Sequence, residues 1–213
     1  MSAEMPNPAG HTPADDEALV VGPRVYLRHP RERDRSAWIE LRRSSRAFLE
    51  PWEPVPMTGV DPFGETGLDA YRSRCDESHT QRHLAFLHNG TLVGHIAMNQ
   101  IVRGVSQNAI LGYWIGEPFA RQGLMTETIR LCLVRAFEHL GLHRVEANVI
   151  PRNEASCRTA ERCGFRREGY SPRYLRIAGG WEDHVRYAMT AEDWAELRSQ
   201  GRGNPNLDAH DLK

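Results

Sequence analysis

The sequence contains very little lysine: Lys213 is the single lysine among 27 lysine and arginine side chains in 213 residues. It has four cysteines and no CxxC pair, so no disulfide framework is indicated and reduced thiols in the cytoplasm are the simplest interpretation. No apolar run approaches the roughly 20 residues that a membrane-spanning helix needs. The formal charge of -1 excludes neither an acidic nor a basic partner. We expect neither membrane insertion nor specific DNA binding.

Residues 22–199 carry the periodic apolar pattern of a folded domain, and their number suffices for one sizeable core. The two ends differ, because residues 1–21 and 200–213 are rich in proline, glycine, asparagine and aspartate. Such a composition offers little apolar surface for burial. We therefore predict a single domain over 22–199 between two flexible tails.

Two kinds of periodicity alternate along this domain. Short apolar or alternating stretches predict strands within 24–28, 84–99, 109–116, 144–150, 168–177 and 182–190. Helical spacing predicts helices at 34–49, 65–75, 124–140 and 153–164. Asp34 and Asn153 are predicted N-caps, and Asn89-Gly90 and Gly179-Gly180 mark hairpins. The order predicts a mixed α/β (α+β) fold with antiparallel ends and one central crossover.

The connection 116–123 has the composition of a phosphate-binding loop. A strand ending near Ile115 and a helix beginning near Leu124 bring together unpaired N–H groups and the positive end of the helix dipole. Gly123 lets the backbone approach an anion closely, and Arg121 adds positive charge. Dinucleotide and Walker fingerprints are absent, so the loop would be a different kind of phosphate site. An ordinary strand-to-helix turn is the alternative.

Several separated segments, in this order, resemble the GNAT acetyltransferases, most closely the RimJ/RimL branch that acetylates N-terminal amines of ribosomal proteins. They are "FLEPWEP", "GYWIGEPFARQGLMTE", "HRVEANVIPRNEASCRTAERCGFRREGY" and "YLRIAGGWEDHVRYAMTAEDW". The resemblance implies a central twisted mixed sheet, mostly antiparallel, flanked by helices and splayed between the "YWI" and "EANVI" strands. It also implies that acetyl-CoA is the cosubstrate, with its pantetheine arm in the splay.

The resemblance places the pyrophosphate of acetyl-CoA on the backbone amides of 121–126, in the window "ARQGLM". Ala120 and Met125 depart from the family pattern Gln/Arg-x-x-Gly-x-Gly/Ala. Backbone amides at the end of the "YWI" strand are expected to polarise the thioester carbonyl. The predicted cofactor-binding residues are Trp114, Ile115, Arg121, Gln122, Gly123, Leu124, Met125, Thr126, Asn153 and Ser156.

Ser156 is the predicted catalytic residue, because Asn153-x-x-Ser156 resembles the family position whose hydroxyl lies near the CoA sulfur. Completing the helix cap is an alternative role of equal weight. The position of the family's base is occupied here by Leu175. Candidates for the base are the titratable side chains near the expected mouth of the site: Glu53, Glu168, Asp183 and His184. A water relay is the alternative, because roughly a tenth of an α-amine is already neutral at pH 7.

The acceptor is expected between the "FLEPWEP" loop, which Pro51 and Pro54 stiffen, and the final hairpin. The predicted acceptor residues are Trp52, Glu53, Tyr174 and Trp181. No metal site is predicted. The pairs His79/His83 and His139/His143 have i, i+4 spacing but lack an intervening glutamate and a third ligand.

Three functions are consistent with these features. The leading hypothesis is acetyl-CoA-dependent acetylation of the N-terminal α-amine of a protein, expected to be a ribosomal protein beginning with Ala or Ser, by direct attack on the thioester. The alternatives are acetylation of a small amine (antibiotic, polyamine or amino acid) and a CoA-binding ribosome-assembly module without turnover. The arginines of 24–46 would allow ribosome contact, although a charged surface helix is the commoner explanation. The sequence leaves the oligomeric state open.

Overall fold

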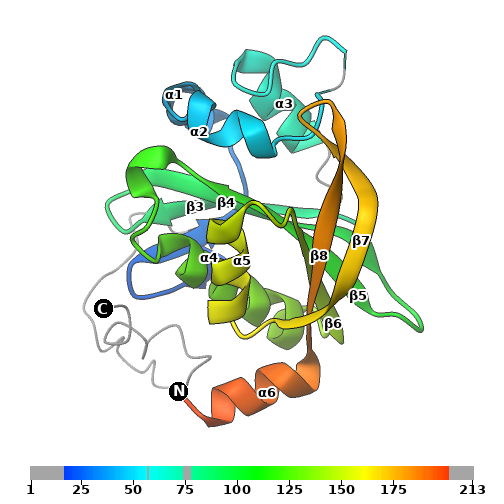
Figure 1. Ribbon diagram of the computed structural model, residues 1–213. Coiled ribbons are helices and arrows are strands. Elements are labelled where there is room, and N and C mark those ends of the chain that lie inside the picture. Colours follow the sequence, from blue (N-terminus) through cyan, green and yellow to red (C-terminus); the bar gives the residue numbers. More distant parts are fainter. Residues whose placement is uncertain (1–16, 57, 74–77, 202–213) are drawn as a thin grey trace, which may run out of the picture.

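The computed structural model describes residues 17–56, 58–73 and 78–201 (Figure 1). Most of the two predicted tails, and Cys75, lie outside these residues. The described strands are β1 (Val20–Val21), β2 (Val25–Arg28), β3 (Gln81–Leu87), β4 (Leu92–Val102), β5 (Asn108–Ile115), β6 (Arg144–Val149), β7 (Arg166–Ile177) and β8 (Gly180–Thr190). The described α-helices are α1 (Arg35–Ser44), α2 (Arg46–Leu49), α3 (Glu65–Ser73), α4 (Leu124–Val134), α5 (Glu154–Arg162) and α6 (Ala191–Ser199). A π-helix, Arg135–His139, continues α4, and short 3-10 helices cover Glu32–Asp34, Glu50–Trp52 and Glu117–Phe119.

The described strands form one eight-stranded sheet in the order β1-β2-β3-β4-β5-β6-β8-β7. Strands β5 and β6 run parallel and are joined by a crossover through α4, whereas the other neighbouring strands are antiparallel. This arrangement confirms the predicted mixed, mostly antiparallel fold with a central crossover. The segment Val20–Val21, in the predicted N-terminal tail, pairs with β2 as the first strand of the sheet.

The sheet opens between its two parallel strands. Strands β5 and β6 pair from Asn108↔Arg144 to Leu111↔Ala147, and their pairing ends there. Strand β5 nevertheless continues to Ile115 and β6 to Val149. The two strands therefore diverge into a wedge at their carboxyl ends, where the resemblance predicted the splay.

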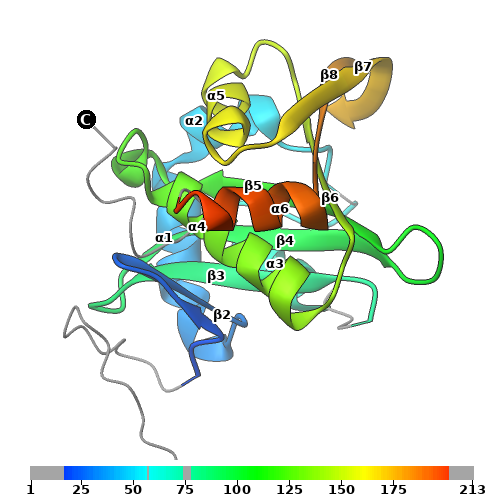
Figure 2. The same ribbon diagram turned by 90° about the horizontal axis from the view of Figure 1, so that it is seen from below.

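Helices cover both faces of the sheet, with α1–α3 on one side and α4–α6 on the other (Figures 1 and 2). Because successive side chains of a strand point to opposite faces, each strand contributes to two cores. In β5, for example, Leu111 packs in the core beneath α4, whereas Trp114 packs in the core beneath α1 and α3. The wedge thus lies between two layers that are each packed independently.

Local signals account for several boundaries. The hairpin between β3 and β4 turns at Asn89-Gly90, where Gly90 has a φ of 84°. Asn153 Oδ1 accepts a hydrogen bond from Ser156 N (3.1 Å) and so caps α5 as predicted. Helix α6 was not predicted, although Thr190 and Asp193 form a capping box at its start.

Two helix predictions need correction. Asp34 stands before α1 but makes no capping bond to that helix: its carboxylate pairs with Arg28 (2.6 Å), both side chains being 4% exposed, and accepts a hydrogen bond from the amide of Arg31 (2.7 Å). A buried guanidinium without a counter-charge would be strongly destabilising, so this pairing takes precedence over the cap. The helix predicted at 34–49 is also divided at the buried Ser45, whose hydroxyl accepts a hydrogen bond from Glu117 N (2.9 Å).

Candidate active site

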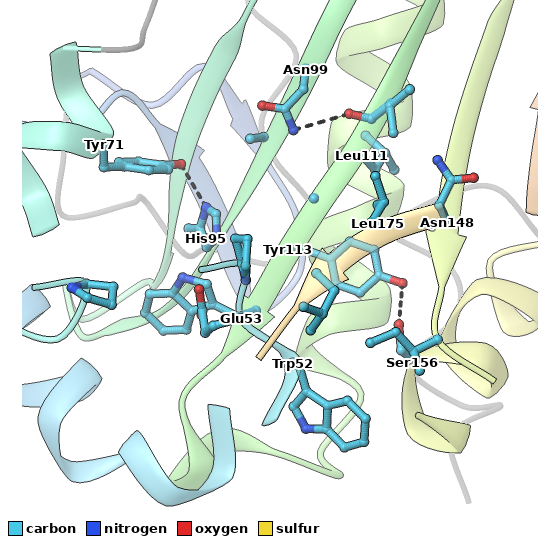
Figure 3. A pocket seen from close by; sticks show the side chains of 18 of the residues that line it. Trp52, Glu53, Tyr71, His95, Asn99, Leu111, Tyr113, Asn148, Ser156 and Leu175 are labelled. Carbon is cyan, nitrogen blue, oxygen red and sulfur yellow. Dashed lines mark hydrogen bonds between the residues drawn. The ribbon is translucent and has the colours of Figure 1, made fainter. Parts of the chain in front are cut away.

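A cavity of about 750 Å³ occupies the wedge between β5 and β6 (Figure 3). Tyr113 and Ser156 line it on the side of α4 and α5. Trp38 and His95 line it on the side of α1 and α3. One cavity is therefore lined by side chains from both faces of the sheet.

The loop before α4 leads into a helix N-terminus, and its residues Arg121 and Gln122 are exposed. Gly123, at the N-cap, has a φ of 74°, and Arg121 has a φ of 61°. The amide of Glu127 donates to the carbonyl of Gly123 (3.1 Å), so the three preceding amides come before the first α-helical bond. These N–H groups, the helix dipole and the absent Cβ at Gly123 fit the pyrophosphate of CoA. Met125, which departs from the family pattern, packs its side chain into the core and leaves the loop clear.

A buried carboxylate ties this loop to the start of the sheet. Glu127 accepts hydrogen bonds from the amides of Arg24 (2.8 Å) and Val25 (3.0 Å) and from Arg24 Nε (2.8 Å). The same guanidinium donates from Nη1 to the carbonyl of Gln122 (2.8 Å). Arg24 therefore neutralises Glu127 and also contacts the candidate phosphate loop through Gln122. Neither Arg24 nor Glu127 was a predicted site residue.

Ser156 has separate partners for its backbone and its side chain. Its amide donates to the Asn153 cap, whereas its hydroxyl lies 2.9 Å from Tyr113 Oη (Figure 3). The amide of Asn153 bonds to the Ile150 carbonyl (2.9 Å), so the serine hydroxyl does not complete a capping box. Burial raises the pKa of Tyr113 well above its ordinary value, so this phenol keeps its proton. The pair presents two neutral hydroxyls to the cavity.

Backbone groups of β5 also face the wedge. The amide of Gly116 bonds to the Val93 carbonyl, and antiparallel alternation then directs the amide of Trp114 toward β4 as well. The amides of Tyr113 and Ile115 point the opposite way, toward the separated β6. Trp114 lines the cavity with its side chain. The backbone N–H groups that face the wedge belong to its two neighbours, Tyr113 and Ile115.

An aromatic wall encloses the cavity on the α1–α3 side; it consists of Trp38, Tyr71, His95 and Trp114. His95 Nδ1 lies 2.9 Å from Tyr71 Oη, which donates to the carbonyl of His83 (3.3 Å). Arg42 is 2% exposed and stacks on Trp114, with 4.9 Å from its guanidinium carbon to the ring centroid. Neither His95 nor Tyr71 was predicted as a site residue. The pairing of His95 with Trp114 in neighbouring strands would have indicated that His95 lies beside the wedge.

Three of the four predicted acceptor residues, Trp52, Glu53 and Tyr174, line the cavity. Glu53 pairs with Arg42 (2.6 Å), and its carbonyl accepts from Ala178 N (2.9 Å), which ties the "FLEPWEP" loop to the β7–β8 hairpin. Trp52 lines the cavity under the guanidinium of Arg152, 4.9 Å from the ring centroid.

The hairpin contributes the other predicted acceptor residues. Tyr174 lines the cavity edge-on to His184, with 5.7 Å between ring centroids. Trp181 is 65% exposed and lies outside the cavity lining. Leu175, at the position of the family's base, also lines the cavity.

The candidate bases differ in position. Glu168 and Asp183 lie outside the cavity lining. Hydrogen bonds from Arg144 and Arg166 lower the pKa of Glu168 to about 2, and that from Tyr170 lowers the pKa of Asp183. His184 does line the cavity, and burial lowers its pKa. The two acids are thus held as surface ion-pair or hydrogen-bond partners.

The structure also places the histidine pairs and the arginine-rich segment. His83 is buried in β3, and the described residues contain no group of three or more His, Cys, Asp or Glu side chains that could hold a metal ion. Arginines of 24–46 pair with carboxylates of the protein, as in Arg35–Asp69 (2.6 Å) and Arg46–Glu50 (3.2 Å). Each helix in the described part of the chain is too short or too polar to cross a membrane.

Comparison with known proteins agrees with this geometry. Residues 24–166 match the acetyltransferase (GNAT) domain family. The chain is 33% identical over 172 residues to the [Ribosomal protein uS5]-alanine N-acetyltransferase of Escherichia coli (strain K12), covering 78% of this chain and 88% of that protein. It is 31% identical over 180 residues to the probable N-acetyltransferase YjcK of Bacillus subtilis (strain 168), covering 82% and 98%.

Among solved structures, Mycobacterium smegmatis RimJ in complex with CoA-disulfide has a TM-score of 0.74 and 33% sequence identity, over 84% of this chain and 90% of that chain. The family match covers most of the fold, and the relatives are matched over nearly their whole length. The predicted resemblance to the RimJ/RimL branch is confirmed. The chain belongs to the GNAT acetyltransferase family and is an N-acetyltransferase.

Proposed function

We propose that the protein acetylates the N-terminal α-amine of a protein in the cytoplasm, and that its substrate is a ribosomal protein beginning with Ala or Ser. The observation that carries this proposal is the cavity through the wedge, which has hydroxyls on the cofactor face and an aromatic mouth on the opposite face. Similarity to a uS5-alanine N-acetyltransferase supports the class of acceptor.

Acetyl-CoA supplies an acetyl group activated as a thioester. The amides at the N-terminus of α4, with Arg121, would hold its pyrophosphate. The wedge-facing amides of Tyr113 and Ile115 are donors suited to the developing charge on the thioester oxygen. The hydroxyl of Ser156, hydrogen-bonded to Tyr113, would protonate the departing sulfur.

The acceptor would enter between the "FLEPWEP" loop and the β7–β8 hairpin. These two elements are joined by the Ala178–Glu53 backbone bond and by a bridge between Pro54 and Ile177, so the groove between them has fixed walls. Trp52 and Tyr174 offer flat surfaces for a peptide chain. A preformed groove of this kind favours an acceptor that continues beyond its reacting amine.

The test is a comparison of initial rates for free alanine, a tripeptide and a hexapeptide with the same N-terminus, alongside spermidine and an aminoglycoside. We expect kcat/KM to rise with peptide length. Internal lysines should be poor acceptors, because a pKa of about 10.4 leaves little neutral amine at pH 7. A small amine that outperforms every peptide would establish the small-molecule alternative. Acetyl-CoA binding without turnover of any amine would indicate the ribosome-assembly module.

A further inference from the structure

The cavity contains a histidine that the roles above leave unused. His95 lies in the middle of β4, paired with Trp114 at the edge of the wedge. Its half-buried side chain lines the cavity on the α1–α3 face, from which the acceptor would enter. The ring packs against the aromatic wall, with centroid distances of 5.2 Å to Trp114 and 6.0 Å to Trp38. His95 is therefore held firmly beside the expected position of the reacting amine.

Hydrogen bonds determine which nitrogen of His95 carries the proton. The Tyr71 hydroxyl lies 2.9 Å from His95 Nδ1 (Figure 3) and 3.3 Å from the carbonyl of His83, which can only accept. Donation of the single hydroxyl proton to that carbonyl makes the phenol oxygen the acceptor toward Nδ1. Nδ1 is then the protonated nitrogen, and Nε2 carries a lone pair. Nε2 has no hydrogen-bond partner among the described residues and is not among the fully buried polar atoms. It is therefore free to accept a hydrogen bond from a molecule in the cavity.

The groups packed around His95 keep it neutral. Arg42 comes from α1 and is paired with Glu53; Arg82 and His83 come from β3, and Tyr71 comes from α3. Burial, reinforced by these positive neighbours, holds the pKa of His95 well below its ordinary value. At neutral pH the lone pair of Nε2 is therefore available in essentially every molecule.

We propose that His95 is the catalytic base on the acceptor side, an assignment that rests on the proposed function. As the amine nitrogen bonds to the acetyl carbon, the carbon–sulfur bond breaks, and the proton of that nitrogen passes to His95 Nε2. The sulfur takes a proton from the Ser156 hydroxyl, which regains one from water in the cavity through the hydrogen-bonded Tyr113 hydroxyl. The imidazolium then releases its proton to water, which burial and the nearby Arg42 favour. His95 thus supplies the base that is missing at Leu175.

The first test compares variants in acetylation of the hexapeptide. His95→Ala should lower kcat by ~10² to 10³-fold, the usual contribution of a positioned base, with acetyl-CoA affinity by calorimetry unchanged. Added imidazole should restore part of that activity. Tyr71→Phe removes the hydroxyl that orients His95 and should lower kcat by about three- to tenfold. His143→Gln, on the surface with a 52% exposed side chain, is the matched control and should behave as wild type.

A second readout does not depend on turnover. Nitrogen-15 NMR of labelled histidine should show Nε2 of His95 unprotonated from pH 6 to pH 9, and Tyr71→Phe should alter this signal. Because the base does not titrate in this range, kcat/KM of the wild type should follow the ionisation of the amine, near pH 8.

Each of three results would overturn the assignment: wild-type kcat in His95→Gln and His95→Ala, a higher peptide KM with kcat unchanged, or a proton on Nε2 at neutral pH. If the His95 variants do not fold, the kcat of Tyr71→Phe and the NMR signal of wild-type His95 test the assignment instead. A normal kcat in Tyr71→Phe then counts against the proposal. Rates of the wild type on the peptides and the small amines, measured in parallel, distinguish a failure of the proposed peptide function from a failure of the His95 assignment. A wild type that prefers a small amine contradicts the peptide function, and the same His95 comparison with that amine still tests the base.

Discussion

Replacing Glu127 tests the anchor that holds the phosphate loop to the sheet. Glu127→Ala would leave the amides of Arg24 and Val25 without their acceptor, and Val25 is fully buried. An unsatisfied buried donor costs about 1–3 kcal/mol, and the half-buried amide of Arg24 adds about 1 kcal/mol. The ion pair contributes at most about 1 kcal/mol, because the Arg24 side chain is 38% exposed. The expected loss is about 3 kcal/mol, or a melting temperature lower by roughly 6–12 °C.

Thermal unfolding followed by circular dichroism measures this loss. Glu127→Gln keeps one carbonyl oxygen as an acceptor and should cost less, about 1–2 kcal/mol. Glu154→Ala is the matched control, because Glu154 also lies in the first turn of a helix but its side chain is 74% exposed and paired with Arg158. That change should cost less than about 0.5 kcal/mol. A melting temperature for Glu127→Ala within about 2 °C of the control would refute the reasoning.

Three further predictions concern the loop, the hydroxyl pair and a buried histidine. Gly123→Glu should take acetyl-CoA binding below detection by calorimetry through steric block and like charge. Gly123→Asn, which tolerates positive φ and adds a Cβ but no charge, should weaken binding less than Gly123→Glu. Ser156→Ala should lower kcat by ~10 to 10³-fold without loss of thermal stability, since Asn153 supplies the cap, and normal turnover would contradict the assigned role. Burial lowers the pKa of His83 from 6.5 to about 3. Below pH 6.5 the unfolded chain therefore takes up a proton that the folded state does not, and the free energy of unfolding falls by about 2 kcal/mol between neutral pH and pH 5. In His83→Leu, the free energy of unfolding measured with urea should fall less between pH 7 and pH 5 than in the wild type. The same pH dependence in both proteins would contradict this prediction.

Much of the fold could be predicted because its signals are local. Asn89-Gly90 imposes a turn wherever two apolar stretches flank it, and Asn153 caps a helix with a residue three positions away. The motif from "GYWIG" to "RQGLMTE" spans a strand, a loop and a helix start in one continuous segment, so the candidate phosphate site could be read from it. Backbone geometry within such a segment depends mainly on its own residues.

The side-chain partnerships of the site were not predictable in the same way. Tyr113 meets Ser156 across 43 residues, His95 meets Tyr71 across 24, and Glu127 meets Arg24 across 103. These contacts depend on strand register and on which face of the sheet each residue occupies, and a shift of one residue would reverse the face. Asp34 is a further case in which the local pattern was not sufficient. The sequence pattern predicts a helix cap, but in the structure the Asp34 carboxylate forms an ion pair with the buried Arg28. The sequence by itself determined most of the elements, the family and a candidate cofactor loop. The tertiary structure decided which polar groups lie together in the wedge, because buried charges and hydroxyls are paired with whichever partners the fold brings near them.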